Sequence, residues 1–198
     1  VMIPYGRQTI DETDIDEVVK ALKGAWITQG PSIEKFERHL AEYCGCKYAV
    51  AVSSGTSALH LACLAAGLRR GDEAITTPIT FVGTANAIIY TGAKPVFADI
   101  DYNTVNINTN QIKKKIGKKT KAILPVHFAG LPCDMQEIAN IAKKSRLIII
   151  EDACHALGSE YKHGSKWVKV GSCMHSDMAV FSFHPVKSIT TGEGGAVL

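Results

Sequence analysis

The fold class follows from one stretch, Leu147-Ile148-Ile149-Ile150-Glu151-Asp152-Ala153, in which apolar residues run directly into two carboxylates. Strands that are buried on both faces of a parallel or mixed sheet read as continuous apolar runs, and Leu147–Ile150 has this form. Other strands are expected at Tyr48–Val52, Glu73–Thr77, Pro95–Ile100, Ala122–Val126, Met178–Phe183 and Ala196–Leu198. Ligands of such sheets bind at the carboxyl ends of the strands, which places Asp152 at the expected ligand edge.

Amphipathic stretches alternate with these strands along the chain. In Thr13–Lys23, the apolar residues Ile15, Val18, Val19 and Leu22 recur at helical spacing. Further helices are expected at Ser32–Tyr43, Thr56–Ala66, Gly83–Tyr90 and Met135–Lys144. Alternating strands and helices predict an α/β fold with a mostly parallel seven-stranded sheet, covered by helices on both faces.

Lys187 and Asp152 together suggest a site for pyridoxal phosphate (PLP). Lys187 lies in a polar segment after the expected strand Met178–Phe183, and Asp152 closes another strand. PLP needs a lysine amine that forms a Schiff base with its aldehyde, and a carboxylate that keeps the pyridine nitrogen protonated. Either residue alone is unremarkable, because loop lysines and strand-end aspartates are common. Their combination with a phosphate site would make the interpretation specific.

A phosphate site is expected where the strand ending at Val52 turns into a helix. Hydroxyls of Ser54, Thr56 and Ser57, with the N-terminal N–H groups of that helix, would converge on an anion, and Gly55 allows close approach. A structural helix cap is the ordinary alternative for such a turn. The chain contains neither G-x-x-x-x-G-K-[ST] nor G-x-G-x-x-G, which argues against a nucleoside triphosphate or a dinucleotide.

These segments together resemble the DegT/DnrJ/EryC1/StrS sugar-nucleotide aminotransferases, within fold type I of the PLP enzymes. The resemblance covers nearly the whole chain and rests on Trp26–Pro31, Ser53–Leu59, Pro78–Val82, Ala85–Ile88, Pro125–His127 with Gly130, Glu151–Ala153 and Phe181–Gly195. It implies that residues 1–198 form an N-terminal segment and the PLP-binding large domain. The small C-terminal domain of the family is then missing from this chain, which stops just inside an apolar strand.

The resemblance also assigns roles to individual residues. Lys187 and Asp152 resemble the catalytic pair, with Lys187 holding PLP and Asp152 facing the pyridine nitrogen. The remaining cofactor contacts implied are Phe81 stacked on the ring, His155 near the phenolic oxygen, and Gly55, Thr56 and Ser182 at the phosphate. The substrate pocket would be lined by Tyr5, Ala25, Trp26, Ile27 and Thr28. Many family members carry glutamine at the position of His155, and core packing is the alternative for Phe81.

The implied reaction is a ping-pong transamination. An amino acid, glutamate in most of the family, would leave its amino group on the cofactor, and a nucleotide-linked 4-keto-6-deoxy sugar would then take it. The segments Ile3–Arg7 and Asp152–Ala156 resemble the members that act on UDP-linked sugars in pseudaminic acid biosynthesis. The family also implies a homodimer whose active sites lie at the subunit interface.

Two alternatives to transamination remain open. Some relatives carry histidine at the lysine position and act as dehydratases, so Lys187 favours transamination over dehydratase or lyase chemistry on a keto sugar. A non-catalytic regulatory domain with the same fold is the second alternative. A glutamate-derived amine on the cofactor would separate the first reaction from dehydration, and absence of any cofactor would favour the regulatory domain.

Composition narrows the partners. The net charge of +3 is small and scattered, which argues against nucleic acid, and the run Lys113-Lys114-Lys115 is interpreted as a solvated helix face. No apolar run approaches the roughly 20 residues that span a bilayer, so we expect no membrane partner and a cytoplasmic location. The six cysteines lack the spacing of a disulfide framework or of a zinc site, so we expect reduced thiols and no metal.

Overall fold

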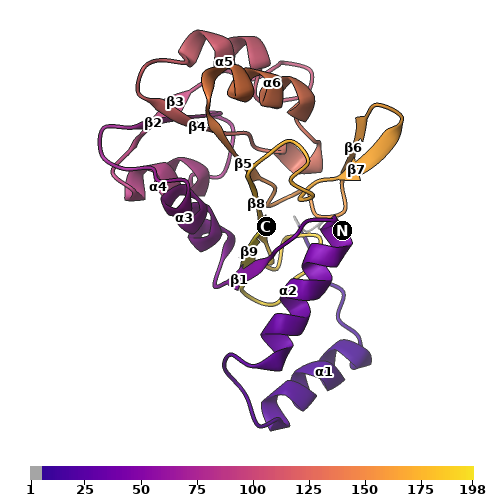
Figure 1. Cartoon of the computed structure of the whole chain (residues 1–198). Coiled ribbons are helices and arrows are strands. Elements are labelled where there is room, and N and C mark those ends of the chain that lie inside the picture. The colour runs from indigo at the N-terminus through magenta and orange to yellow at the C-terminus, as the bar shows by residue number, and fades with distance from the viewer. Residues whose placement is uncertain (1–5) are drawn as a thin grey trace.

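One sheet of seven strands runs through the computed structural model, which describes residues 6–198 (Figure 1). Its strands are β1 Val50–Val52, β2 Glu73–Thr76, β3 Lys94–Phe97, β4 Thr120–Leu124, β5 Ile148–Asp152, β8 Met178–Ser182 and β9 Gly195–Val197. They lie in the order β1-β9-β8-β5-β4-β2-β3. The prediction of a mostly parallel seven-stranded sheet is confirmed, and each expected strand belongs to it.

Strand β9 is the exception to the common direction. It pairs antiparallel with both β1 and β8, whereas the β8–β5, β5–β4, β4–β2 and β2–β3 pairs are parallel. Because β9 runs against both of its neighbours, β1 points the same way as β8. The carboxyl ends of all strands except β9 therefore meet at one edge of the sheet, which is where such sheets bind ligands.

Helices cover both faces of this sheet. They are α1 Glu12–Lys23, α2 Pro31–Cys44, α3 Gly55–Ala65, α4 Gly83–Tyr90, α5 Thr109–Lys115 and α6 Met135–Ser145. Successive residues of β5 point to opposite faces, so Ile150 packs in the cluster under α3 and α4, and Ile149 in the cluster under α5 and α6. Helix α2 covers β8 on the second of these faces, where Phe36 meets Phe183 edge to face at 5.3 Å. The continuous apolar run of β5 is thus explained by burial on both faces.

Several elements were not expected from the sequence. A two-stranded hairpin, β6 Glu160–His163 with β7 Lys166–Lys169, lies outside the main sheet. Its signal was the pair Gly164-Ser165 between short strands, with Gly164 at φ +60°. The short 3-10 helix η1, Phe128–Gly130, was also missed. Helix α5 contains the lysine run as its exposed last turn, which confirms the interpretation of that run as a solvated helix face.

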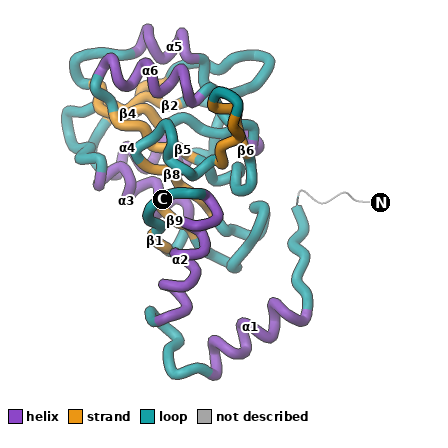
Figure 2. Tube along the Cα trace, turned by 45° about the vertical axis from the view of Figure 1, so that its right-hand side comes forward, coloured by secondary structure: helices purple, strands orange, loops and turns teal. Residues whose placement is uncertain are grey.

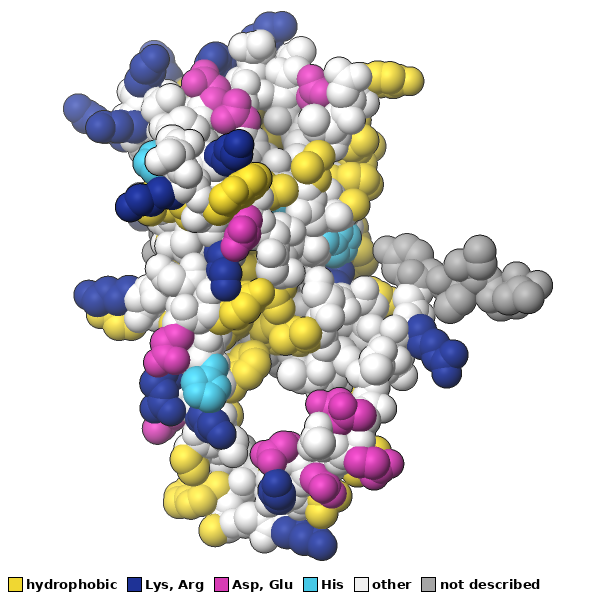
Figure 3. All heavy atoms as spheres, turned by 90° about the vertical axis from the view of Figure 1, so that its right-hand side faces the viewer, with side chains coloured by type: hydrophobic (Ala, Val, Ile, Leu, Met, Phe, Trp, Pro, Cys, Tyr) yellow, Lys and Arg dark blue, Asp and Glu magenta, His cyan; other side chains and the backbone are white. Residues whose placement is uncertain are grey.

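Helix α1 stands apart from the rest of the molecule (Figure 2), and the space-filling view shows an opening between it and the body (Figure 3). The predicted helix is present, capped at its start by Asp11, but it has no buried residue. Its apolar stripe of Ile15, Val18, Val19 and Leu22 is exposed. A sequence stripe of this kind normally marks a face that packs on a core, and within residues 6–198 nothing covers it.

Two further findings concern residues 6–198 only. No helix there is both long and apolar enough to cross a membrane. The six cysteines are free thiols, and in that part of the chain no group of three or more potential metal ligands converges.

Candidate functional site

A cavity of about 480 Å³ opens at the carboxyl edge of the sheet, among the residues that follow β1, β2, β4, β5 and β8. Sites for small organic ligands are typically about 300–1,000 Å³, so the cavity has the size of a cofactor site. All the expected cofactor contacts line it: Gly55, Thr56, Phe81, Asp152, His155, Ser182 and Lys187. They come from separate parts of the chain and are gathered because their strands end at the same edge.

The first helical turn of α3 forms one end of this cavity. Ser54 caps the helix, its Oγ accepting from the N–H of Ser57 at 3.1 Å. A Cβ on Gly55 would lie 2.8 Å from the Cβ of Ser182 and 3.1 Å from the Sγ of Cys154. Gly55 therefore lets the helix start pack directly on the end of β8. This contact sets Thr56 and Ser182 beside the partial positive charge of the helix N-terminus, which favours an anion.

One of the three hydroxyls expected at the phosphate lies elsewhere. Ser54 and Thr56 line the cavity, whereas Ser57 is not among its lining residues. The Oγ of Ser57 lies 3.0 Å from that of Ser54 and 3.1 Å from that of Ser53. The expectation for Ser57 was wrong because this side chain turns back to the preceding loop. The turn is a structural cap and also a wall of the cavity, and its binding of a phosphate stays a prediction.

Asp152 occupies the floor of the cavity. It is buried, with 5% of its surface exposed, and its Oδ2 accepts from Thr84 Oγ1 at 2.6 Å. The backbone N–H of Cys154 donates to Oδ1 at 3.2 Å. On the main chain, Asp152 N donates to the carbonyl of Pro125, and the N–H of His127 donates to the carbonyl of Asp152. These bonds fix the carboxylate, while its remaining lone pairs stay free for a ligand in the cavity.

Lys187 and Phe81 line the cavity on segments that follow β8 and β2. Lys187 is half-buried in a turn in which its N–H donates to the carbonyl of His184 at 2.9 Å. Phe81 is 69% exposed, which argues against the alternative that it is a core residue. Gly83 makes its position possible, since a Cβ there would come within 2.9 Å of the Phe81 ring. A large exposed ring beside a cavity is available to stack on a planar ligand.

His155 and Cys154 follow Asp152 in the cavity wall. Burial, and then the positive charge of Lys187, lower the pKa of His155, although Asp152 acts in the opposite direction. Its imidazole is therefore neutral at pH 7 and can donate one hydrogen bond and accept another. Burial, and then the negative charge of Asp152, raise the pKa of Cys154 well above its usual range, so the thiol stays protonated. Neither group adds charge to the cavity.

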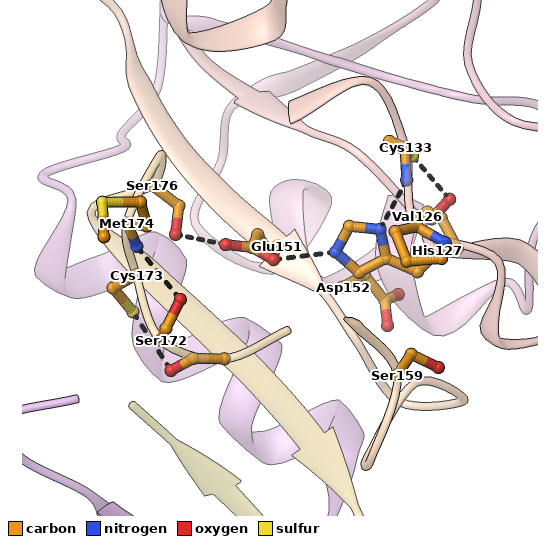
Figure 4. A network of polar contacts seen from close by, with 12 residues as sticks. Val126, His127, Cys133, Glu151, Asp152, Ser159, Ser172, Cys173, Met174 and Ser176 are labelled. Carbon is orange, nitrogen blue, oxygen red and sulfur yellow. Dashed lines mark hydrogen bonds and ion pairs between the residues drawn. The ribbon is translucent and has the colours of Figure 1, made fainter. Parts of the chain in front are cut away.

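A second polar network lies on the opposite side of β5, because Glu151 points away from Asp152 (Figure 4). Both Glu151 and His127 are fully buried, and His127 Nε2 lies 2.8 Å from Glu151 Oε2. The N–H of Cys133 donates to His127 Nδ1 at 3.0 Å, which leaves Nε2 to carry the ring hydrogen. The hydroxyl of Ser176 donates to the other carboxylate oxygen of Glu151. This network ties the end of β4 and the loop before β8 to β5.

Four of the five expected substrate residues do not line this cavity. Tyr5 lies outside the described residues. Ala25, Trp26, Ile27 and Thr28 are exposed in the connection between α1 and α2, away from the cavity lining. Their assignment to the substrate pocket stays a prediction.

The structure adds residues that sequence reasoning missed. Thr84 contacts Asp152 directly, and Thr80, His127 and Glu193 line the cavity. No sequence signal singled out Thr84, which lies between the segments Pro78–Val82 and Ala85–Ile88 of the family resemblance. The other three lie within segments that carry the family resemblance, but no individual role was expected for them.

Comparisons with known proteins agree with this geometry. A family model described as the DegT/DnrJ/EryC1/StrS aminotransferase family matches residues 8–198. The chain is 48% identical over 200 residues to UDP-4-amino-4,6-dideoxy-N-acetyl-beta-L-altrosamine transaminase of Campylobacter jejuni, covering 100% of this chain and 51% of that protein. The chain spans about half the length of the curated relatives it matches.

Solved structures give the same result for the fold. The PLP form of Spr1654 from Streptococcus pneumoniae, described as a sugar aminotransferase, superposes with a TM-score of 0.92 at 34% identity, covering 98% of this chain and 52% of that one. PseC from Helicobacter pylori, described as an aminotransferase involved in the biosynthesis of pseudoaminic acid, superposes with a TM-score of 0.89 at 38% identity, covering 98% and 51%. Both likenesses support fold type I of the PLP enzymes.

Proposed function

Because the chain belongs to the DegT/DnrJ/EryC1/StrS aminotransferase family, we propose that its protein is a PLP-dependent aminotransferase acting on a nucleotide-linked sugar. The observation that carries the proposal is the single cavity that holds Lys187, Asp152 and the N-terminus of α3 together. An amine, a buried carboxylate and an anion site are the groups that PLP requires.

The residues present fit the cofactor. Gly55 leaves a cradle at the start of α3 that a Cβ would fill, and Thr56 and Ser182 supply hydroxyls beside it for a phosphate. Asp152 lies buried at the floor and keeps unused lone pairs for a protonated ring nitrogen. Phe81 supplies an exposed aromatic surface for the ring. The neutral imidazole of His155 can donate a hydrogen bond to the phenolic oxygen.

Each residue of the site would have a separate role in the reaction. When bound, PLP supplies an aldehyde that bonds to amines and a ring that withdraws electrons from the substrate carbon. Lys187 Nζ would hold the cofactor and, once displaced by the donor amine, carry the proton at the substrate carbon. Asp152 would pair with the protonated ring nitrogen and so sustain electron withdrawal. Phe81 would limit ring movement and the access of water from its side.

The proposal also names the amino acceptor and the amino donor. We infer that the acceptor is a UDP-linked 4-keto-6-deoxy sugar of pseudaminic acid biosynthesis, and that glutamate is the amino donor. The functions of the Campylobacter and Helicobacter relatives support this substrate class. Ala25–Thr28 would contribute to the sugar pocket after assembly, since all four residues are exposed.

We also propose how the protein assembles. We infer a cytoplasmic homodimer in which the remainder of the protein and a second subunit complete the site. Apolar side chains exposed on α1, together with Leu61, Leu64, Ile89 and Tyr90 on α3 and α4, support burial against further protein.

The decisive experiment uses the full-length protein with added PLP. We expect a visible absorbance band that borohydride removes, with the reduced adduct located on Lys187 by mass spectrometry. Lys187→Ala should lack both, whereas Lys118→Ala, at an exposed position, should behave like the wild type. Glutamate should then abolish the band by transamination. A folded wild type without band or adduct would refute PLP binding, and a band that glutamate leaves unchanged would favour the dehydratase.

A further inference from the structure

We propose that Thr84 is a positioning residue that orients the carboxylate of Asp152 toward the cofactor, an inference that rests on the proposed PLP function. Thr84 lies in the first turn of α4 and Asp152 at the end of β5, and 68 positions separate them in the chain. Their side chains nevertheless meet at 2.6 Å in a buried contact.

The proton of Thr84 is committed to Asp152. The Oγ1 of Thr84 lies 2.6 Å from Asp152 Oδ2, 3.2 Å from the carbonyl of Phe81 and 2.9 Å from Thr80 Oγ1. A hydroxyl carries a single hydrogen, and a carboxylate is a stronger acceptor than a carbonyl. The shortest contact is also the one to the charged acceptor. Thr84 therefore donates to Asp152, and Thr80 donates to Thr84.

The resulting chain of hydroxyls runs from the cavity wall to the floor. Thr80 lines the cavity, whereas Thr84 is fully buried behind it. Because Thr84 is the second residue of α4, the carboxylate also lies by the positive end of that helix dipole. Hydrogen bonds of this kind polarise one another in a low-dielectric interior. Thr84, which Thr80 contacts in turn, thus supports the carboxylate from its buried side.

These contacts fix the orientation of the Asp152 carboxylate. Thr84 holds Oδ2 and the N–H of Cys154 holds Oδ1, so both oxygens of Asp152 are bound on the protein side. The plane of the carboxylate is then set before the ligand arrives, and the lone pairs left over are those available to a ring N–H. Loss of the Thr84 hydroxyl would leave Oδ2 with one donor fewer and the carboxylate freer to rotate.

The test measures the equilibrium binding of two ligands to the full-length protein. These are PLP and a phosphorylated analogue in which carbon replaces the pyridine nitrogen. Thr84→Val removes the hydroxyl and keeps the shape. We expect PLP to bind roughly 10- to 100-fold more weakly, as for loss of a hydrogen bond to a charged group. The analogue should weaken by less than about threefold, since it offers no ring N–H to Asp152. Thr84→Ser should restore PLP binding.

A matched control removes a hydroxyl from the other end of the same helix. Thr91 Oγ1 donates to the carbonyl of Ile88, and Thr91→Val should leave both affinities unchanged. Thermal unfolding reports whether each variant folds, and Thr84→Ala serves if Thr84→Val does not.

The outcomes separate the two proposals. Equal PLP affinity of wild type and Thr84→Val overturns the positioning role and leaves the PLP function standing. Equal weakening of PLP and the analogue overturns it as well, because Thr84 would then only support the shape of the cavity. A folded wild type that binds neither ligand refutes the PLP function and the inference with it.

Discussion

Gly55 shows how a missing side chain can define a site. Thr56 and Ser182 can serve one anion because α3 starts in contact with the end of β8, and Gly55 is the point of that contact. A methyl group there would have to displace the Cβ of Ser182, which is bonded directly to the backbone of β8, or the half-buried thiol of Cys154. The cradle therefore depends on glycine for space, not for an unusual backbone angle.

We predict that Gly55→Ala destabilises the protein by about 1–3 kcal/mol, the usual cost of forcing extra volume into a packed region. Weaker PLP binding should accompany it, since the new methyl lies at the proposed phosphate cradle. Gly117→Ala is the matched control, because a Cβ at Gly117 meets nothing within 4 Å. That variant should be neutral or more stable by up to about 1 kcal/mol. Chemical denaturation measures the free energy of unfolding of the wild type and the two variants. Equal values for all three would show that Ser182 can move aside at little cost.

At the scale of elements, β5 carries two buried carboxylates that point to opposite faces. Asp152 faces the cavity and Thr84, whereas Glu151 faces His127 and Ser176 (Figure 4). The second network links the end of β4 and the loop before β8 to the strand that lies between them. These contacts hold the strand ends together under the site. They also give Glu151 hydrogen-bond partners, without which a fully buried carboxylate would be costly.

His127→Ala should therefore cost about 3–5 kcal/mol of unfolding free energy, since it leaves Glu151 without its histidine partner in the interior. The comparison is Lys20→Ala, which breaks the exposed pair of Lys20 with Glu17 and should cost less than about 0.5 kcal/mol. Denaturant titration at neutral pH measures both changes. A loss below about 1 kcal/mol for His127→Ala would mean that Glu151 finds another donor or takes up a proton.

The molecule as a whole consists of a layered α/β body and one helix that leaves it. The body has a sheet with apolar clusters on both faces, and α1 contributes no buried residue to either cluster (Figure 1). The apolar stripe of α1 does not pack against the other described residues.

A matched pair of substitutions tests this separation. Within residues 1–198, Ile138→Ala in α6, at a fully buried site, should cost about 2–5 kcal/mol. Ile15→Ala in α1, where the side chain is 45% exposed, should change stability by less than about 0.5 kcal/mol. In the full-length protein, a cost of Ile15→Ala that rises well above this value would identify α1 as a docking element. Equal costs in the short and full-length chains would contradict that role.

The amino-acid sequence alone determined those properties that are local. Apolar runs such as Leu147–Ile150 predicted buried strands, helical spacing predicted α1 and α6, and the motifs around Lys187 and Gly55 indicated a phosphate-bearing cofactor. All seven cofactor residues that the family resemblance implied line one cavity. The hairpin β6–β7 escaped prediction because its two strands are short and largely polar.

Only the tertiary structure decided which residues meet. Strand order and direction bring Thr84 to Asp152, turn Glu151 toward His127, and leave Ser57 outside the cavity. The same is true of α1, whose amphipathic pattern gives no sign of what covers it. The physical reason is that hydrophobic periodicity records whether a face is buried, whereas contacts between distant residues depend on register and on which strands lie next to each other.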